Sequence, residues 1–248
     1  MKSRKRQGGI SIVIPVYNEG GNIRAALAEI KAKVRTPHNV LIVYDFEEDN
    51  TLPVVREMAA RGEVAGLALV RNKYGRGVLN AIKTGFESAD REAVLVVMAD
   101  LSDDLAVVDG MYAKLKAGYG VVCGSRYMKG GRQIGGPFLK KALSRTAGLT
   151  LHLIAGIPTH DATNSFKMYS KELLDNIEIE STGGFELGME LVIKAHFKGY
   201  GVTEVPSTWK DRVEGESRFM LMKWLPRYLH WYFFAFRNAA FGKRPGKA

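Results

Sequence analysis

Three carboxylates follow an apolar run and have the chemistry to hold a metal ion. Residues 94–98 are apolar, and Asp100, Asp103 and Asp104 come directly after them. Carboxylate oxygens are the ligands that Mg²⁺ and Mn²⁺ prefer, and a metal held in this way commonly binds phosphate. A buried parallel strand whose carboxyl end opens into a binding site gives this pattern. The alternative is a strand followed by a helix that Ser102 or Asp103 caps.

Two further stretches carry groups for binding an anion or a polar ligand. Asp45 ends a second apolar run, 40–44. The segment 71–77 is basic, contains two glycines and stands just before a helical pattern, with Lys73 and Gly75 at its centre. Backbone N–H groups at the start of a helix can bind phosphate, so this segment is a candidate anion site. A plain turn explains the same residues equally well.

The elements that would position these groups alternate along the first half of the chain. Helical patterns separate runs that are typical of strands, which we expect at 10–16, 40–45, 67–70, 94–98 and 119–123. Such alternation predicts βαβ units and a mainly parallel sheet. The carboxyl ends of its strands would then meet at one edge, together with the charged residues that follow them, namely Glu19, Asp45, Arg71, Asp100 and Arg126. This convergence favours a binding site over a simple helix cap.

The second half has a different character. The glycine-rich stretch 129–137, which contains Arg132, is predicted to be a loop, and 138–154 has a helical pattern. A short strand is expected within 161–169, and a helix should begin near Glu186 and run to about residue 198. A last short strand is expected at 202–205.

The segment 219–241 combines aromatic and basic side chains. It holds nine aromatic residues, and its basic residues recur at spacings that a helix places on one stripe: Lys223, Arg227, His230 and Arg237. A basic, aromatic amphipathic helix is typical of a segment that lies in a membrane interface. A helix packed on its own domain or on a partner protein is the alternative.

Composition limits the partners and the location. The chain has 36 Lys and Arg against 26 Asp and Glu, a net charge of +10, which indicates an anionic partner. No nucleic-acid recognition motif accompanies the charge, so nucleic acid is not expected. The single cysteine, Cys123, excludes an internal disulfide. No signal peptide and no apolar run of about 20 residues is present, which predicts a cytoplasmic protein, soluble or peripheral. Basic tails are expected at 1–9 and 242–248.

Several of these motifs occur together in a recognisable order. Those of the first half are 12–19, 43–45, 71–77, 99–102 and 124–127, and those of the second half are Asp161, 165–167, 184–186 and 211–218. The set resembles the inverting GT-A glycosyltransferases of family 2, and the later motifs resemble their dolichol-phosphate mannosyltransferase branch. The resemblance spans roughly residues 10–220, and it implies a Rossmann-like α/β domain, which we place at 10–218, before the amphipathic helix expected from the residue pattern at 219–241.

The resemblance also implies roles for individual residues. The donor, a nucleotide-sugar, would be bound by Pro15, Tyr17, Glu19 and Asp45, with Lys73 and Gly75 of the glycine-rich stretch as further candidates. Asp100 would be the metal-coordinating acid, and Arg126 and Glu186 would act at the reacting groups. The phosphate of a lipid acceptor would be bound by Arg132, Arg212, Ser217 and Arg218.

Two positions depart from the family's pattern. Phe46 follows Asp45 where a second acid is usual, and Met98 replaces the first acid of the metal-binding motif. Methionine is a poor ligand for a hard cation. Asp103 is therefore the expected second ligand for Mg²⁺ or Mn²⁺ beside Asp100.

These observations lead to one preferred hypothesis and two alternatives. We expect inverting transfer of a sugar from a nucleotide-sugar to a polyprenyl phosphate, at the cytoplasmic face of a membrane and with a possible membrane subunit. A phosphate monoester is largely ionised at neutral pH and needs no strong base. A hydroxyl acceptor would need one, and Glu186 or Asp161 is the candidate. The third reading is a catalytically weak nucleotide-sugar-binding protein that has lost its metal site through Met98.

Overall fold

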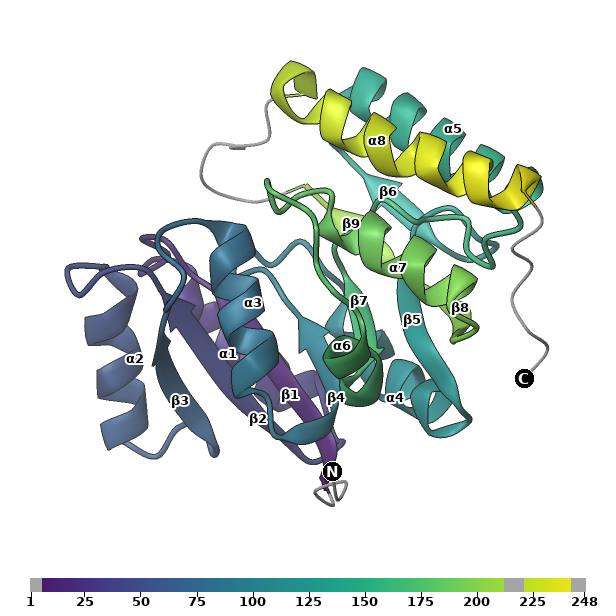
Figure 1. The fold of residues 1–248 in the computed structure, drawn as a ribbon. Helices are drawn as coiled ribbons and strands as arrows, with labels where there is room; N and C mark the ends of the chain where they lie inside the picture. The colour runs from purple at the N-terminus through teal and green to yellow at the C-terminus, as the bar shows by residue number, and fades with distance from the viewer. Residues whose placement is uncertain (1–5, 212–220, 242–248) are drawn as a thin grey trace.

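A seven-stranded sheet organises the chain, of which the computed structural model describes residues 6–211 and 221–241 (Figure 1). The strand order is β3-β2-β1-β4-β7-β5-β8. The strands are β1 (Gln7–Pro15), β2 (His38–Tyr44), β3 (Leu67–Arg71), β4 (Arg91–Val96), β5 (Tyr119–Ser125), β7 (Lys167–Ser170) and β8 (Gly201–Pro206). Only β7 is antiparallel to its neighbours within this sheet, so the prediction of a mainly parallel α/β sheet is confirmed.

Helices cover both faces of the sheet (Figure 1). They are α1 (Ile23–Lys33), α2 (Thr51–Ala60), α3 (Val78–Ser88), a short 3₁₀ turn η1 (Leu105–Val107), α4 (Val108–Lys116), α5 (Phe138–Leu153), α6 (Lys171–Asn176), α7 (Leu187–Phe197) and α8 (Leu221–Ala240). Alternate side chains of a strand point to opposite faces. In β1, Ile12 and Ile14 pack in the core under α1 and α4, whereas Val13 packs in the core under α3 and α7.

The glycine-rich stretch predicted as a loop contains a short strand. β6 (Arg132–Ile134) pairs in parallel with β9 (Thr208–Lys210) in a separate two-stranded sheet. This pairing joins residues that lie far apart in the chain, so local sequence patterns do not reveal it. It ties the segment after β5 to the segment after β8, because both continue beyond the carboxyl edge of the main sheet.

Helix caps also differ from the predictions. Neither Ser102 nor Asp103 caps the next helix, because Asp104 accepts the backbone N–H of Ala106 at 3.1 Å. At the start of α1, the Asn22 side chain makes no cap hydrogen bond and donates to Glu19 at 2.9 Å. Asp100 and Asp103 are thus not used as caps.

Helix α8 lies along α5 and against α7 (Figure 1). Trp231 and Ala235 of α8 are buried against the core, and the Tyr232 hydroxyl lies 2.9 Å from Thr150 Oγ1 of α5. The described part of the chain contains no helix with the length and apolar character needed to cross a bilayer.

Candidate functional site

Asp45, directly after β2, holds the segment 71–77 in place. The Asp45 carboxylate accepts the Asn72 side-chain amide at 2.7 Å and the Gly77 backbone N–H at 2.9 Å. Asn72 also donates to the Gly75 carbonyl at 2.7 Å, and Gly75 has a φ of 85°, which favours glycine. Asp45 therefore shapes the loop before α3 through both of its oxygens. The ammonium group of Lys73 forms an ion pair with Glu87 of α3.

Aromatic side chains line the adjacent ends of β1 and β2. The rings of Tyr17 and Phe46 meet edge to face with centroids 5.4 Å apart, and the Arg76 guanidinium lies 4.9 Å from the Phe46 centroid. Tyr17 is exposed, while Pro15, at the end of β1, is buried. The aromatic pair offers a flat surface on which a nucleobase can stack. From the sequence, Phe46 was noted only because it stands where the family usually has a second acid.

A buried aspartate that the sequence did not single out joins these loops. Asp49 accepts the backbone N–H of Asn18 at 3.1 Å and the N–H of Thr51 at 2.8 Å. The Thr51 hydroxyl in turn accepts the Glu19 N–H at 2.9 Å. The loop after β1 is thereby fixed to the start of α2, with Glu19 half-buried beside it.

The acidic turn after β4 places two carboxylates in different environments. Asp100 is half-buried and accepts the Ser102 N–H at 3.1 Å. Asp103 is 7% exposed, and its Oδ2 has no hydrogen-bond partner among the described residues. Burial, together with the charge of Asp100, raises the pKa of Asp103 to about 7. Leu101, between them, has a φ of 59°, which is uncommon for a residue with a branched side chain.

The residues of this turn fit a divalent cation. A buried carboxylate oxygen without a partner is costly, and a bound cation removes that cost. A cavity of about 10 Å³, with room for about one water molecule, is lined by Asp103, by Glu29 and otherwise by apolar residues. No group of three or more acid, histidine or cysteine side chains able to hold a metal occurs in the described residues. A cation at Asp100 and Asp103 would therefore need further ligands from a bound molecule or from water.

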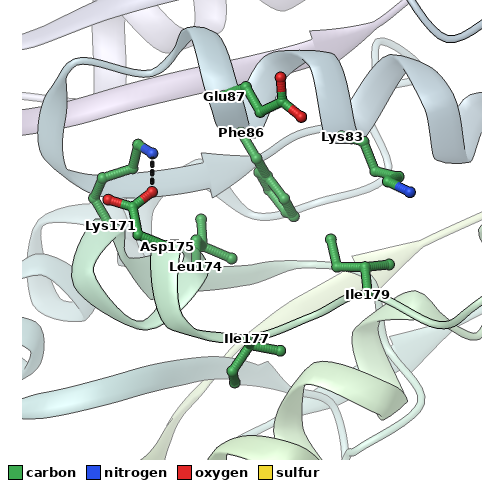
Figure 2. Close-up of a pocket in the computed structure, with 8 residues that line it drawn as sticks. All are labelled: Lys83, Phe86, Glu87, Lys171, Leu174, Asp175, Ile177 and Ile179. Carbon is green, nitrogen blue, oxygen red and sulfur yellow. Dashed lines mark hydrogen bonds and ion pairs between the residues drawn. The ribbon is translucent and has the colours of Figure 1, made fainter.

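A larger cavity of about 200 Å³ lies elsewhere (Figure 2). It is formed by the second half of α3 and by α6, with an ion pair between Lys171 and Asp175 at its rim. None of the residues predicted for the site lines it. The strand ends instead face Gly77 at the opposite end of α3, so this cavity is not part of the candidate site.

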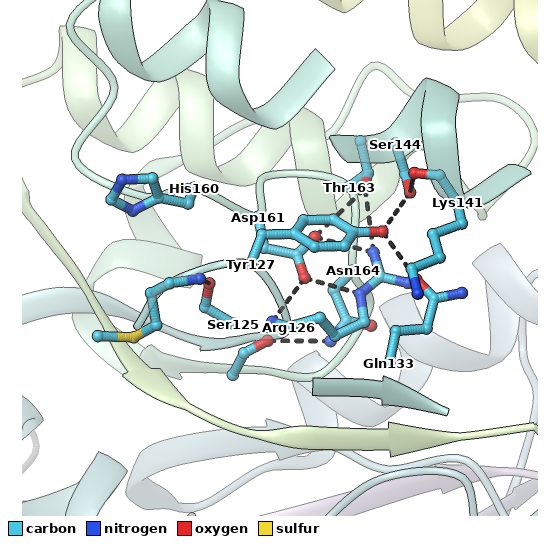
Figure 3. Close-up of polar contacts among 12 residues, drawn as sticks. Ser125, Arg126, Tyr127, Gln133, Lys141, Ser144, His160, Asp161, Thr163 and Asn164 are labelled. Atoms are coloured by element: carbon cyan, nitrogen blue, oxygen red, sulfur yellow. Dashed lines mark hydrogen bonds and ion pairs between the residues drawn. The ribbon is translucent and has the colours of Figure 1, made fainter. Parts of the chain in front are cut away.

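The end of β5 carries a buried ion pair (Figure 3). The Arg126 guanidinium donates to both oxygens of Asp161, at 2.7 and 2.8 Å, and the Arg126 backbone N–H donates to the same carboxylate at 3.0 Å. Asp161 has no exposed surface, and the charge and hydrogen bonds of Arg126 lower its pKa despite burial. Asp161 therefore stays ionised and is a poor acceptor of a proton.

Lys167 interacts electrostatically with both members of this ion pair, and it was not predicted as a site residue although it belongs to the motif 165–167. Its ammonium group is fully buried and donates to the Asn164 carbonyl. Burial lowers the pKa of Lys167, and the charges of Asp161 and Asp103 oppose that shift. The motif 165–167 could have marked it, but a lysine is almost never fully buried, so its burial was not expected. It supplies positive charge behind the acidic turn.

Glu186 stands at the start of α7 under helix α8. It is 1% exposed, its Oε1 accepts the Gly183 N–H at 2.8 Å, and its Oε2 has no hydrogen-bond partner among the described residues. Tyr228 of α8 donates to the neighbouring Phe185 carbonyl at 2.6 Å. The charges of Glu186, Arg126 and Asp161 all act on the Tyr228 hydroxyl, whose pKa burial raises. The start of α7 and the end of β5 thus form one charged region.

The remaining predicted acceptor residues are less well placed. Arg132 is exposed on β6, where its backbone N–H donates to the Ser207 carbonyl at 3.0 Å. Arg212, Ser217 and Arg218 lie outside the described residues. Their predicted role in binding an acceptor phosphate stays a prediction.

Comparison with known proteins identifies the family. Residues 11–178 match the family described as Glycosyl transferase family 2, which is more than half of the chain. The chain belongs to glycosyl transferase family 2. This family-2 chain is 28% identical over 233 residues to a protein named dolichol-phosphate mannosyltransferase from Pyrococcus furiosus, covering 87% of this chain and 64% of that relative. It is 29% identical over 213 residues to the polyprenol monophosphomannose synthase of Mycolicibacterium smegmatis, covering 84% of this chain and 79% of that one.

A solved structure supports the fold. The glucosyl-3-phosphoglycerate synthase of Mycobacterium tuberculosis, crystallised with Mn²⁺, UDP-glucose and phosphoglyceric acid, superposes with a TM-score of 0.66. The match covers 94% of this chain and 80% of that protein at 16% sequence identity. The GT-A fold predicted for this family-2 chain is therefore confirmed.

Proposed function

We propose that this protein transfers a sugar, with inversion, from a nucleotide-sugar to a polyprenyl phosphate at a membrane surface. The observation that carries the proposal is the edge of the sheet where acids, a buried arginine and a shaped glycine-rich loop converge. The names of the two relatives support the acceptor class, since both act on a dolichol or polyprenol phosphate by name. The chain spans 64% of the length of the Pyrococcus relative.

The donor would lie across the ends of β1, β2 and β4. Tyr17 and Phe46 present a stacking surface for the base. Arg76, in the loop held by Asp45, lies over the Phe46 ring and supplies a guanidinium that can bind a donor phosphate. Asp100 and Asp103 are the residues that would hold Mg²⁺ or Mn²⁺, and such an ion neutralises charge on a leaving diphosphate. The first predicted ligand position, Met98, contributes no oxygen.

The acceptor side favours a phosphate over a hydroxyl. A hydroxyl nucleophile needs a general base. Asp161 is a poor one, because Arg126 holds both of its oxygens and lowers its pKa. A phosphate monoester is already ionised and needs positive charge and correct placement instead.

The membrane surface is supported by two neighbouring helices. Nine of the thirteen exposed large apolar side chains among the described residues lie on or directly after α5 and α8: Phe138, Leu139, Leu143, Leu149, Leu153, Ile154, Leu229, Phe233 and Phe241. We call this set the apolar face. Lys140, Lys141 and Arg145 lie on α5 beside it. Apolar residues flanked by cations are typical of a surface that rests on an anionic leaflet, and the cytoplasmic leaflet is the anionic one.

A second candidate, transfer to a sugar hydroxyl, is favoured by one observation. Glu186 is a buried carboxylate with an unpartnered oxygen, which is an arrangement suited to a general base. Glu186→Gln would then abolish turnover and leave donor binding intact. With a phosphate acceptor we expect only a partial loss.

The test is a transfer assay with purified full-length protein. Labelled nucleotide-sugars, first selected by thermal shift, are incubated with undecaprenyl phosphate and Mn²⁺ or Mg²⁺. The proposal expects a labelled product that partitions into organic solvent and is released by mild acid. Label that appears only in water-soluble glycans would assign the acceptor to the second candidate, and no turnover on any donor would favour a binding protein.

A further inference from the structure

Helix α8 turns one of its arginines toward the site. The sequence pattern places Arg227 and Arg237 on one stripe, but ten residues at 100° per residue separate them by about 80° around a helix. Arg227 is half-buried on the side of Trp231, and Arg237 is exposed. The two arginines therefore have different surroundings.

Arg227 is held at the loop that carries Glu186. Its guanidinium lies 4.8 Å from the centre of the Trp224 ring. A Cβ added at Gly183 would lie 2.3 Å from Arg227 Nη1 and 2.9 Å from Glu186 Oε2, so both groups reach the same point. Only glycine leaves room for them there. The hydrogen bond from Tyr228 to Phe185 fixes α8 in this register.

The hydrogen-bonding groups around this point are not fully paired. Arg227 forms no ion pair with any described carboxylate, although Glu186 lies close to it. A guanidinium has five N–H donors, and leaving them without acceptors in a half-buried place is unfavourable. Arg126, the other nearby arginine, is already neutralised by Asp161. Arg227 thus has guanidinium N–H donors at this end of the site that no described carboxylate takes up in an ion pair.

We propose that Arg227 binds the phosphate of the lipid acceptor; this inference rests on the proposed function. A guanidinium can donate to two phosphate oxygens at once. The contact between the Arg227 guanidinium and the Trp224 ring holds the guanidinium in place. The exposed residue of the next turn but one, Phe233, belongs to the apolar face, so a lipid chain at the membrane and a phosphate at Arg227 are served by one helix. Arg227 is then a binding residue that brings the acceptor phosphate beside Glu186.

The first test compares Arg227→Gln with Arg237→Gln. Both substitutions remove one positive charge from α8, but only the first removes the inward guanidinium. Farnesyl phosphate dispersed in detergent is the acceptor, which removes any contribution of a bilayer. We expect Arg227→Gln to raise the acceptor KM roughly 10- to 100-fold and to leave the donor KM unchanged. Arg237→Gln should change both by less than about twofold, and equal effects of the two variants would overturn the inference.

A second measurement needs no variant and so does not depend on folding. Phenylglyoxal modification of wild-type arginines is mapped by mass spectrometry with farnesyl phosphate, with farnesol, or with neither. Farnesyl phosphate should protect Arg227 and leave Arg237 reactive, and an unprotected Arg227 under saturating farnesyl phosphate would overturn the inference while leaving the proposed function intact. If wild-type protein binds farnesyl phosphate no better than farnesol, the proposed acceptor class itself fails, and the role of Arg227 falls with it.

Discussion

The ion pair between Arg126 and Asp161 is the most heavily buried charge contact at the end of β5. The two residues are 35 positions apart in the chain and meet because the segment before β7 returns beside β5. Their family motifs were recognised separately, but nothing in the sequence indicated that the arginine would be neutralised. The pairing changes the interpretation of both, since Arg126 now has a fixed position and a compensated charge.

Asp161→Asn should destabilise the protein strongly. The amide keeps the size of the side chain but leaves Arg126 buried without its counter-charge, which costs about 3–5 kcal/mol of unfolding free energy. Urea denaturation monitored by tryptophan fluorescence measures the loss. Arg56→Gln, which removes one partner of an exposed ion pair with Glu47, is the matched control and should cost less than about 1 kcal/mol. Similar losses in both variants would contradict the assignment.

The same pair predicts the direction of the acid dependence. The pKa of Asp161 is lower in the folded protein than its ordinary value of 3.8. Its contribution to stability is therefore fully present above about pH 4 and is lost as the pH falls through the lowered folded value. Wild-type unfolding free energy should fall in that acid range by more than that of Asp161→Asn. Parallel pH curves for the two proteins would show that the carboxylate is not linked to folding.

Met98 tests how much a missing carboxylate matters at the acidic turn. Met98→Asp adds an acid beside Asp100 and Asp103, so the metal-free protein should be less stable through repulsion. Mn²⁺ affinity, measured by calorimetry with the nucleoside diphosphate present, should rise roughly tenfold because the ligand charge increases. Met98→Asn, which has no charge, is the control. An affinity that does not change in Met98→Asp would place the cation elsewhere.

At the scale of elements, α5 and α8 pack side by side. The sequence predicted α8 as an interfacial helix, which stays a prediction. The alternative of packing on its own domain is correct in part, because Trp231 and Ala235 are buried while Phe233 is exposed. The pattern of α5 gave no indication of an exposed apolar side, since its leucines have the spacing of an ordinary core-facing helix. Only the packing of α8 along α5 shows which side chains remain uncovered.

Phe233→Asp should weaken binding to vesicles. The side chain is 62% exposed, so the substitution has little effect on folding, and it removes apolar area from the surface that would enter the bilayer. Co-sedimentation with vesicles that contain anionic phospholipid should show at least a tenfold loss of partitioning. Tyr119→Asp is the control, because Tyr119 is an exposed aromatic residue at the first position of β5 and is not part of the apolar face. It should leave partitioning nearly unchanged. An equal loss in both variants would indicate a general charge effect.

Across the whole molecule, the order of strands and helices was predictable because it depends on local periodicity. The βαβ rhythm, the parallel sheet and the convergence of strand ends all follow from patterns within short windows. Contacts between distant segments were not predictable. These include the β6–β9 pair, the antiparallel insertion of β7 and the meeting of Arg227 with Gly183. They arise from tertiary packing, which a single sequence does not encode locally.

Membrane binding should have two contributions, electrostatic attraction through the net charge of +10 and burial of the apolar face, and salt should affect them differently. Cations near an anionic surface contribute about 1 kcal/mol each, and that contribution decays over a Debye length of about 10 Å at 0.1 M salt and 3 Å at 1 M. The burial of apolar side chains is not screened in this way. Partitioning on anionic vesicles should therefore fall as salt is raised and then level off above zero, whereas neutral vesicles should bind weakly with little dependence on salt. Phe233→Asp should lower the partitioning that remains at high salt. It should have a smaller effect on how much partitioning is lost between low and high salt. Complete release from anionic vesicles at 1 M salt would mean that electrostatic attraction alone holds the protein and that the apolar face does not enter the bilayer.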